Sequence, residues 1–188
     1  MRAAHVRRAL ALGLAIAAAA FAFAACGGGG GDTSSPVIDK VADAEVLNEI
    51  LARQTAAVAA YDHVLHGLGA RALADARLFR AQEQEHVDAI LKALRSLDAE
   101  ADPPAESIDA ASLKSEAEYL TFLYELESAT IEAELTAIAK LTGPAARLMV
   151  AATVANQAQH LVLLRRDLGA KPAEAVPAPF EDGTTPAP

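Results

Sequence analysis

Two short motifs in this chain of 188 residues combine an acidic or amide side chain with a histidine three positions later. They are Glu83-Gln-Glu-His86 and Gln157-Ala-Gln-His160. Residues three apart lie on the same face of an α-helix, so each motif could direct an oxygen and an imidazole nitrogen toward one point. Because such atoms are ligands of iron, zinc and other divalent metals, the motifs predict metal-based chemistry, provided that the fold brings them together.

Three further polar residues lie among the apolar positions of segments with helical periodicity. At 100° per residue, Glu127 and Glu134 fall on the apolar face of their segment, and Gln54 falls on that of an earlier one. A buried carboxylate is costly unless it is paired or binds a metal, so these positions predict a buried polar site. The same periodicity predicts a second, solvated set of acidic residues on the opposite face, namely Glu118, Glu125 and Glu132.

Two weaker candidates lie near the end of the first periodic segment. His63 and His66 have a spacing compatible with a metal site, but they face away from the apolar stripe that contains Tyr61. We therefore expect a solvated histidine pair. Tyr61 itself could donate a hydrogen bond to a buried carboxylate or be part of the apolar core, and we favour the core interpretation.

Four segments with apolar stripes would position these residues, and no segment shows the alternation typical of a β-strand. The expected helices comprise residues 39–68, 72–97, 113–142 and 145–168. Gly67-Leu68-Gly69 ends the first segment, and Gly143-Pro144 separates the last two, so both of these connections are short. An aromatic content of only 4% also favours helix over sheet. Four helices of similar length predict a four-helix bundle.

The long connection between the second and third helices determines the expected topology. It spans residues 98–112 and could extend to roughly 50 Å, whereas a helix of 26 residues is about 39 Å long. The chain can therefore return along the bundle, which makes the second and third helices parallel. We expect an all-α, up-down-down-up four-helix bundle with one long crossover. One layer in the middle of this bundle would hold Gln54, Glu83, Glu127 and Gln157.

These motifs resemble those of the ferritin-like superfamily, whose di-metal members take one glutamate from each of two helices and Glu-x-x-His from the other two. The likeness to secreted bacterial ferritin-like domain proteins is carried by Glu83-Gln-Glu-His86-Val-Asp-Ala-Ile, Leu126-Glu-Ser-Ala-Thr-Ile-Glu and Ala155-Asn-Gln-Ala-Gln-His160. The resemblance covers about residues 41–168 and implies a ferritin-like bundle. It places at ligand positions Glu83, His86, Glu127 and His160.

Two positions depart from the pattern that the resemblance implies. Gln54 and Gln157 stand where that pattern has glutamates, and an amide carries no charge and bridges hard metal ions poorly. Glu134 stands where these relatives often have an aromatic residue, and it could contribute a further carboxylate. We therefore expect a degenerate carboxylate–histidine site.

Three functions stay open on the sequence alone. In the interpretation that we favour, the layer is non-enzymatic: the amides of Gln54 and Gln157 donate hydrogen bonds to the glutamates Glu83 and Glu127, while the two histidines complete the network. In the second, the layer binds iron or another divalent metal. In the third, a dinuclear iron centre retains ferroxidase-type activity.

Residues 1–25 resemble a bacterial lipoprotein signal peptide. Three arginines precede an uncharged apolar run that ends in Ala24-Ala25-Cys26. We expect cleavage before Cys26, lipidation of Cys26 and a flexible Gly-rich tether over residues 26–38. Two alternatives stay open, because the run is close to the length of a transmembrane anchor and its paired arginines could direct twin-arginine export.

The overall charge and the two chain ends suggest where the protein acts. Removal of residues 1–25 takes away three arginines and no acidic residue, which changes the formal charge from −9 to −12 and argues against nucleic-acid binding. We expect a domain attached by its N-terminal lipid to the outer side of the cytoplasmic membrane in the cell envelope. We also expect a monomer or dimer rather than a cage, and a Pro- and Ala-rich tail over residues 169–188. The sequence leaves the protein partner unknown.

Overall fold

The computed structural model describes residues 37–106 and 109–176, and every regular element within these ranges is helical. The elements are α1 (Lys40–Val64), the 3-10 turn η1 (Leu65–Gly67), α2 (Ala70–Ser96), α3 (Glu116–Lys140), α4 (Pro144–Asp167) and α5 (Pro172–Ala175). The expected signal peptide, Cys26 and the greater part of the tether and tail lie outside the described residues. None of the described helices combines the length and apolarity needed to cross a bilayer.

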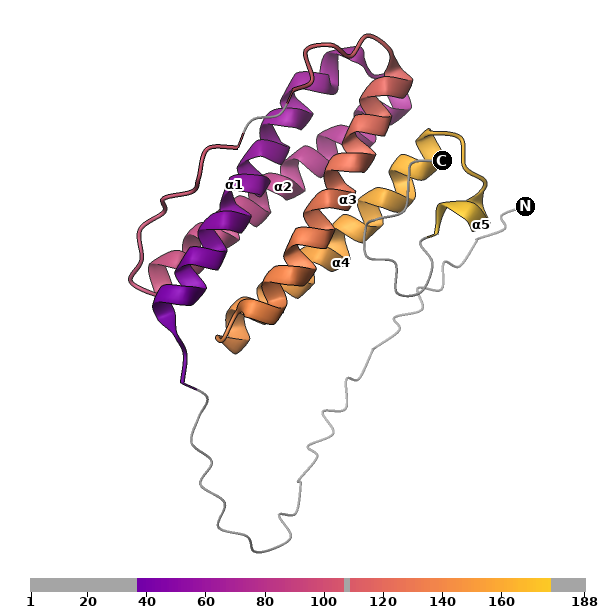
Figure 1. The fold of residues 1–188 in the computed structure, drawn as a ribbon. Coiled ribbons are helices and arrows are strands. Elements are labelled where there is room, and N and C mark those ends of the chain that lie inside the picture. Colours follow the sequence, from indigo (N-terminus) through magenta and orange to yellow (C-terminus); the bar gives the residue numbers. More distant parts are fainter. Residues whose placement is uncertain (1–36, 107–108, 177–188) are drawn as a thin grey trace, which may run out of the picture. The chain divides into compact units, whose positions relative to one another are not determined.

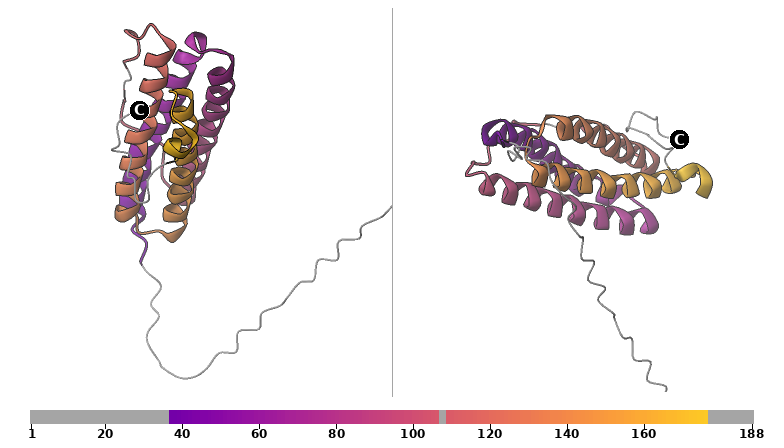
Figure 2. Two further views of the ribbon diagram at one scale, coloured as in Figure 1. Left: turned by 90° about the vertical axis from the view of Figure 1, so that its right-hand side faces the viewer. Right: turned by 90° about the horizontal axis from the view of Figure 1, so that it is seen from below.

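The four long helices lie side by side as two antiparallel hairpins, α1 with α2 and α3 with α4 (Figures 1 and 2). Contacts are most extensive within each hairpin, and α1 also packs along α3. The crossover returns along the outside of α1, where the backbone N–H of Asp102 donates to Asn48 Oδ1 at 2.8 Å (Figure 1). The predicted all-α, up-down-down-up bundle with one long crossover is confirmed.

Local side-chain bonds determine where the helices begin. Asp39 caps α1 by accepting a hydrogen bond from the backbone N–H of Ala42 at 3.1 Å. Ser115 caps α3, and Glu118 reaches back to accept from the backbone N–H of Ser115 at 2.8 Å, which completes a capping box. For this reason α3 begins at Glu116, three residues later than its apolar pattern alone predicts.

A buried aspartate connects the start of α1 to the turn between α3 and α4. Asp43 accepts from the backbone N–H groups of Thr142 and Gly143 at 2.7 and 2.8 Å and from the Thr142 hydroxyl at 3.1 Å. A Cβ at Gly143 would lie 2.7 Å from the Asp43 carboxylate, so the close approach requires glycine. The partners of Asp43 lie about a hundred residues away along the chain, so the sequence alone does not reveal this link.

The apolar core consists of two clusters with polar residues between them. The cluster that includes Tyr61 and Leu123 lies toward the α1–α2 turn. The cluster that includes Leu47 and Leu94 lies toward the opposite end, where α1 begins. The buried polar side chains of the candidate site come from positions along the helices between these two clusters. The bundle thus holds the candidate site in its middle, away from both ends.

The segment after α4 contains one short helix that the sequence does not reveal. In α5, Ala175 is 2% exposed and the helix packs against α4. Four residues are too few to show helical periodicity, so the sequence predicts only an irregular tail there.

Candidate metal centre

Glu83 of α2, Glu127 of α3 and His160 of α4 converge in the middle of the bundle. His160 Nδ1 lies 3.0 Å from Glu127 Oε1 and 3.4 Å from Glu83 Oε1. Each residue offers one ligand atom, and these atoms all lie within 4.8 Å of one another. No side chain of the three is more than 2% exposed. Three helices therefore bring together three of the four residues that the resemblance places at ligand positions.

His86, the fourth of these residues, lies at the margin of the group. Its Nδ1 atom is 3.3 Å from Glu83 Oε2, and its side chain is 13% exposed. The i, i+3 spacing within α2 thus places a second imidazole against Glu83, on its more solvent-accessible side.

The imidazole of His160 is held on both its face and its far edge. The ring of Phe79 stacks on it with a centroid distance of 4.2 Å and an interplanar angle of 24°. His160 Nε2 lies 2.8 Å from Gln82 Oε1, a contact that sequence analysis misses. Both ring nitrogens therefore face oxygen acceptors, which fits an imidazole that carries two protons and a positive charge.

Tyr61 contributes a hydrogen bond as well as apolar packing. Its hydroxyl donates to Glu127 Oε1 at 2.5 Å, and its side chain is fully buried. The interpretation of Tyr61 as a core residue alone is therefore wrong. Its position on the apolar stripe is the signal from which either role could be predicted.

Gln54 and Glu134 form a separate buried pair. Gln54 Nε2 donates to Glu134 Oε1 at 2.8 Å, and neither side chain is exposed. Gln54 is seven residues before Tyr61, and Glu134 is seven residues after Glu127, so this pair lies about 10 Å along the bundle from the Tyr61–Glu127 pair. The predicted single layer containing both Gln54 and Glu127 is therefore wrong.

Gln157 is fully buried, and neither its amide oxygen nor its amide nitrogen has a hydrogen-bond partner among the described residues. The predicted network, in which Gln54 and Gln157 donate to Glu83 and Glu127, is therefore wrong. Gln54 instead donates to Glu134, and Gln157 donates to neither glutamate.

Burial and neighbouring charges shift the protonation equilibria of the site. Burial, with the charge of Glu83, raises the pKa of Glu127 above its usual value. Burial alone would raise the pKa of Glu83, but its contacts with His160 and His86 outweigh this effect and lower it. Burial would lower the pKa of His160, but Glu127 and Glu83 raise it to about 9. The site therefore favours one positive charge between two carboxyl groups.

Several buried oxygen atoms in this region lack a donor. The atoms that accept no well-formed hydrogen bond from a described residue are Gln54 Oε1, Glu83 Oε1, Glu127 Oε2, Glu134 Oε2 and Gln157 Oε1. Buried acceptors are normally satisfied, and a set of oxygens without donors suits a cation. Two carboxylates and an imidazole also match the ligand preferences of divalent iron, manganese and zinc. The residues present therefore fit a metal ion.

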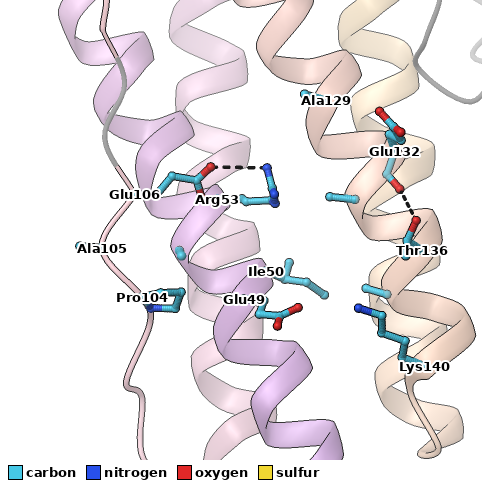
Figure 3. A pocket seen from close by; sticks show the side chains of 13 residues that line it. Glu49, Ile50, Arg53, Pro104, Ala105, Glu106, Ala129, Glu132, Thr136 and Lys140 are labelled. Carbon is cyan, nitrogen blue, oxygen red and sulfur yellow. Dashed lines mark hydrogen bonds and ion pairs between the residues drawn. The ribbon is translucent and has the colours of Figure 1, made fainter.

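A groove of about 600 Å³ lies between α1, α3 and the crossover (Figure 3). Its lining includes Ile50 on α1, and Ala133 and Ala137 on α3. These residues are within one turn of Gln54 or Glu134 along their helices. The groove therefore lies beside the buried Gln54–Glu134 pair without exposing it.

The remaining candidates lie on the surface. His63 and His66 are exposed, and their ring centroids are 5.8 Å apart. The structure also exposes the acidic residues that sequence analysis assigns to the solvated face, Glu118, Glu125 and Glu132.

Comparison with solved structures reveals several similar folds, including the following two. A conserved hypothetical protein from Mycobacterium tuberculosis is 18% identical, with a TM-score of 0.64, and the match covers 74% of this chain and 97% of that one. A structure of ferritin like, diiron-carboxylate proteins from Bacillus anthracis str. Ames is 20% identical, with a TM-score of 0.61 and coverage of 70% and 98%. At these identities the likeness shows the fold alone.

Comparison with curated proteins finds no match. The model of the ferritin-like domain family, in contrast, matches residues 14–170, which is most of the chain. The chain therefore belongs to the ferritin-like domain family.

Proposed function

We propose that this ferritin-like domain binds one divalent transition metal ion, iron foremost, between Glu83, Glu127 and His160. The observation that carries the proposal is the convergence of three buried ligand atoms, beside which Glu83 Oε1 and Glu127 Oε2 accept no well-formed hydrogen bond. If the buried polar residues only formed hydrogen bonds with one another, few of their atoms would lack a partner.

The surrounding residues would hold the proposed ligands in place. Tyr61 donates to Glu127, while Phe79 and Gln82 hold the ring of His160. Such outer contacts orient metal ligands and tune their basicity. A bound iron ion would supply Lewis acidity and one-electron chemistry at this position.

The neutral amides of Gln54 and Gln157 favour the binding of a single metal ion and argue against rapid oxidation of Fe(II). Gln54 and Gln157 carry no negative charge. A second ion near the Gln54–Glu134 pair would therefore depend on Glu134 for its carboxylate ligand. Burial raises the pKa of Glu134 to about 8, so this group is mostly protonated at neutral pH. We therefore propose that a second metal ion binds only weakly near Glu134. We also propose that the protein binds metal without acting as an enzyme.

The proposed location follows from the N-terminal sequence. Residues 1–25 would direct export, and a lipid on Cys26 would attach the bundle to the outer side of the cytoplasmic membrane. The support is the order of positive, apolar and small residues immediately before the single cysteine.

A second candidate function, a metal-free interaction module, is favoured by one observation. A positively charged His160 already lies between Glu83 and Glu127, and it compensates their charge without an ion. In that case the bundle keeps the family fold and presents its surface to an unidentified protein partner.

Metal titration of protein prepared without a histidine tag separates these functions. We expect calorimetry and metal analysis to give about one Mn(II), Zn(II) or anaerobic Fe(II) ion per chain. Glu127→Gln should weaken affinity on the order of tenfold or more. Glu125→Gln on the exposed face of the same helix is the matched control and should bind as the unaltered protein does.

Circular dichroism must show that both variants keep the helical fold. Absence of binding by the unaltered protein would contradict metal binding and favour the interaction module. Equal binding by the two variants would place the ion elsewhere.

A further inference from the structure

An apolar groove opens at the end of the bundle where α1 begins, α2 ends and α4 begins. We call it the basal groove, and its volume is about 610 Å³, which is the size of a small-molecule pocket. Its apolar lining includes Leu47, Ala89, Ala93, Leu97, Ala146 and Met149. The basal groove is separate from the candidate metal centre, since none of the proposed ligands lines it.

Exposed apolar side chains gather around this end. The described residues include seven large hydrophobic side chains that are exposed. Four of the seven are at or near the starts of α1 and α4, namely Val37, Ile38, Val41 and Leu148. Val37 is 90% exposed, Val41 71% and Leu148 74%, while Ile38 also lines the basal groove. Such a gathering around an apolar groove marks an interaction surface.

Two lysines border the same groove. Lys40 and Lys92 contribute to its lining, and Lys40 is paired with Asp98 at 2.8 Å. Lys92 is exposed and forms no ion pair with a described residue. The acidic side chain in the lining, Asp43, is occupied by its hydrogen bonds to Thr142 and Gly143. Among the charged residues that line the groove, Lys92 is therefore the one without a partner among the described residues, in a protein whose net charge is negative.

The position of the N-terminal segment indicates what this surface meets. The chain enters α1 at this end, and the residues before Val37 include the uncharged apolar run 9–25. Val37 lies eleven positions after Cys26, a span that reaches at most roughly 40 Å, about the length of the bundle's own helices. A lipid on Cys26 would thus keep the start of α1 within roughly 40 Å of the membrane surface.

We propose that the basal groove binds an acyl chain of an anionic phospholipid, with Lys92 next to the headgroup and Val37 and Val41 in contact with the bilayer. Apolar side chains flanked by lysine are the combination that binds anionic membrane surfaces. This proposal rests on the membrane attachment included in the proposed function, and it is independent of metal binding.

A single tryptophan can report contact with lipid, because the natural chain has none. The processed chain carrying Val41→Trp is extracted from the membranes of the producing cells and reconstituted in phosphatidylcholine vesicles. These vesicles contain roughly a quarter phosphatidylglycerol and brominated acyl chains, which quench tryptophan on contact. We expect about a twofold loss of fluorescence relative to vesicles without bromine. Leu78→Trp, at an exposed position on α2, is the control and should lose almost none.

Flotation with the vesicles is measured on the same samples. If neither variant floats, membrane attachment itself is wrong, and this proposal is wrong with it. If both float and are quenched equally, attachment stands and the lipid-binding groove is wrong.

Charge and occupancy are tested in the same assay. Lys92→Glu in the Val41→Trp chain should reduce quenching about twofold, whereas Lys114→Glu, at an exposed lysine outside the groove, should not. Equal effects of the two charge reversals would contradict the headgroup assignment. If Met149→Trp fluorescence is already blue-shifted without vesicles and brominated lipid does not quench it, the groove is closed to acyl chains, which overturns the proposal.

Discussion

Burial of Glu134 gives the protein a distinct pH dependence. The pKa rises from its ordinary value of 4.5 to about 8, so the native state holds a proton that the unfolded chain has lost. This contribution to stability is fully present below about pH 4.5 and is lost as the pH rises through 8. Glu134→Gln should therefore increase the free energy of unfolding by a few kcal/mol at alkaline pH and much less at acidic pH.

Urea unfolding across the range from about pH 4.5 to 8 checks this expectation. Glu125→Gln changes an exposed carboxyl on the same helix and should leave the pH profile unaltered. A constant difference between Glu134→Gln and the unaltered protein at every pH would contradict the shifted titration.

The buried amide of Gln157 should destabilise the metal-free protein, since neither of its polar atoms has a partner. Gln157→Leu keeps similar volume and removes the unsatisfied group, so we expect stabilisation by about 1–3 kcal/mol in thermal or urea unfolding without metal. Gln159→Leu, at an exposed position two residues later, should change stability little. Destabilisation by Gln157→Leu would show that the amide has an unrecognised partner in solution.

At the residue scale, the sequence predicts which side chains face inward but not their partners. Helical periodicity suffices to place Glu83, Glu127 and His160 together, because each lies on an apolar stripe. The pairing of Gln54 with Glu134 depends on the axial position of α1 relative to α3. Side-chain packing between the helices determines this position, and the apolar periodicity of each helix does not predict it. Gln82 was missed for the same reason: its contact with His160 crosses between helices.

At the scale of elements, Asp43 should contribute strongly to stability through its link between α1 and the α3–α4 turn. Asp43→Ala removes three hydrogen bonds and leaves the N–H groups of Thr142 and Gly143 without their acceptor. We expect a loss of about 2–4 kcal/mol in urea unfolding. Asp39→Ala, which removes an ordinary helix cap nearby, should lose only about 1 kcal/mol. Equal losses would contradict the special role of Asp43.

The four long helices and their crossover follow from apolar periodicity and connection lengths, and the structure agrees with both. The start of α3 could also have been found, because Ser115 and Glu118 form a recognisable capping box. The hydrogen bonds of Asp43 could not have been predicted, since its carboxylate oxygens accept from backbone N–H groups about a hundred residues away.

At the scale of the whole molecule, the proposed attachment to the membrane would depend on one atom, the sulfur of Cys26. Cys26→Ser should abolish fatty-acid labelling and prevent removal of residues 1–25, because lipoprotein processing requires the cysteine. Mass spectrometry of the purified protein and its N-terminal sequence check both outcomes. An unchanged N-terminus with unchanged labelling would contradict lipoprotein processing.

The pairing of the helices into two hairpins has a kinetic consequence. Each hairpin joins segments that are close along the chain, so its loop closes quickly, whereas docking one hairpin on the other must also close the crossover. The contacts of Tyr61 with Glu127 and of His160 with Glu83 both join different hairpins, and we expect them to form after the rate-limiting step. Interactions formed that late slow unfolding without speeding folding. An ion held between the hairpins would therefore prolong the lifetime of the native state while leaving its rate of formation unchanged.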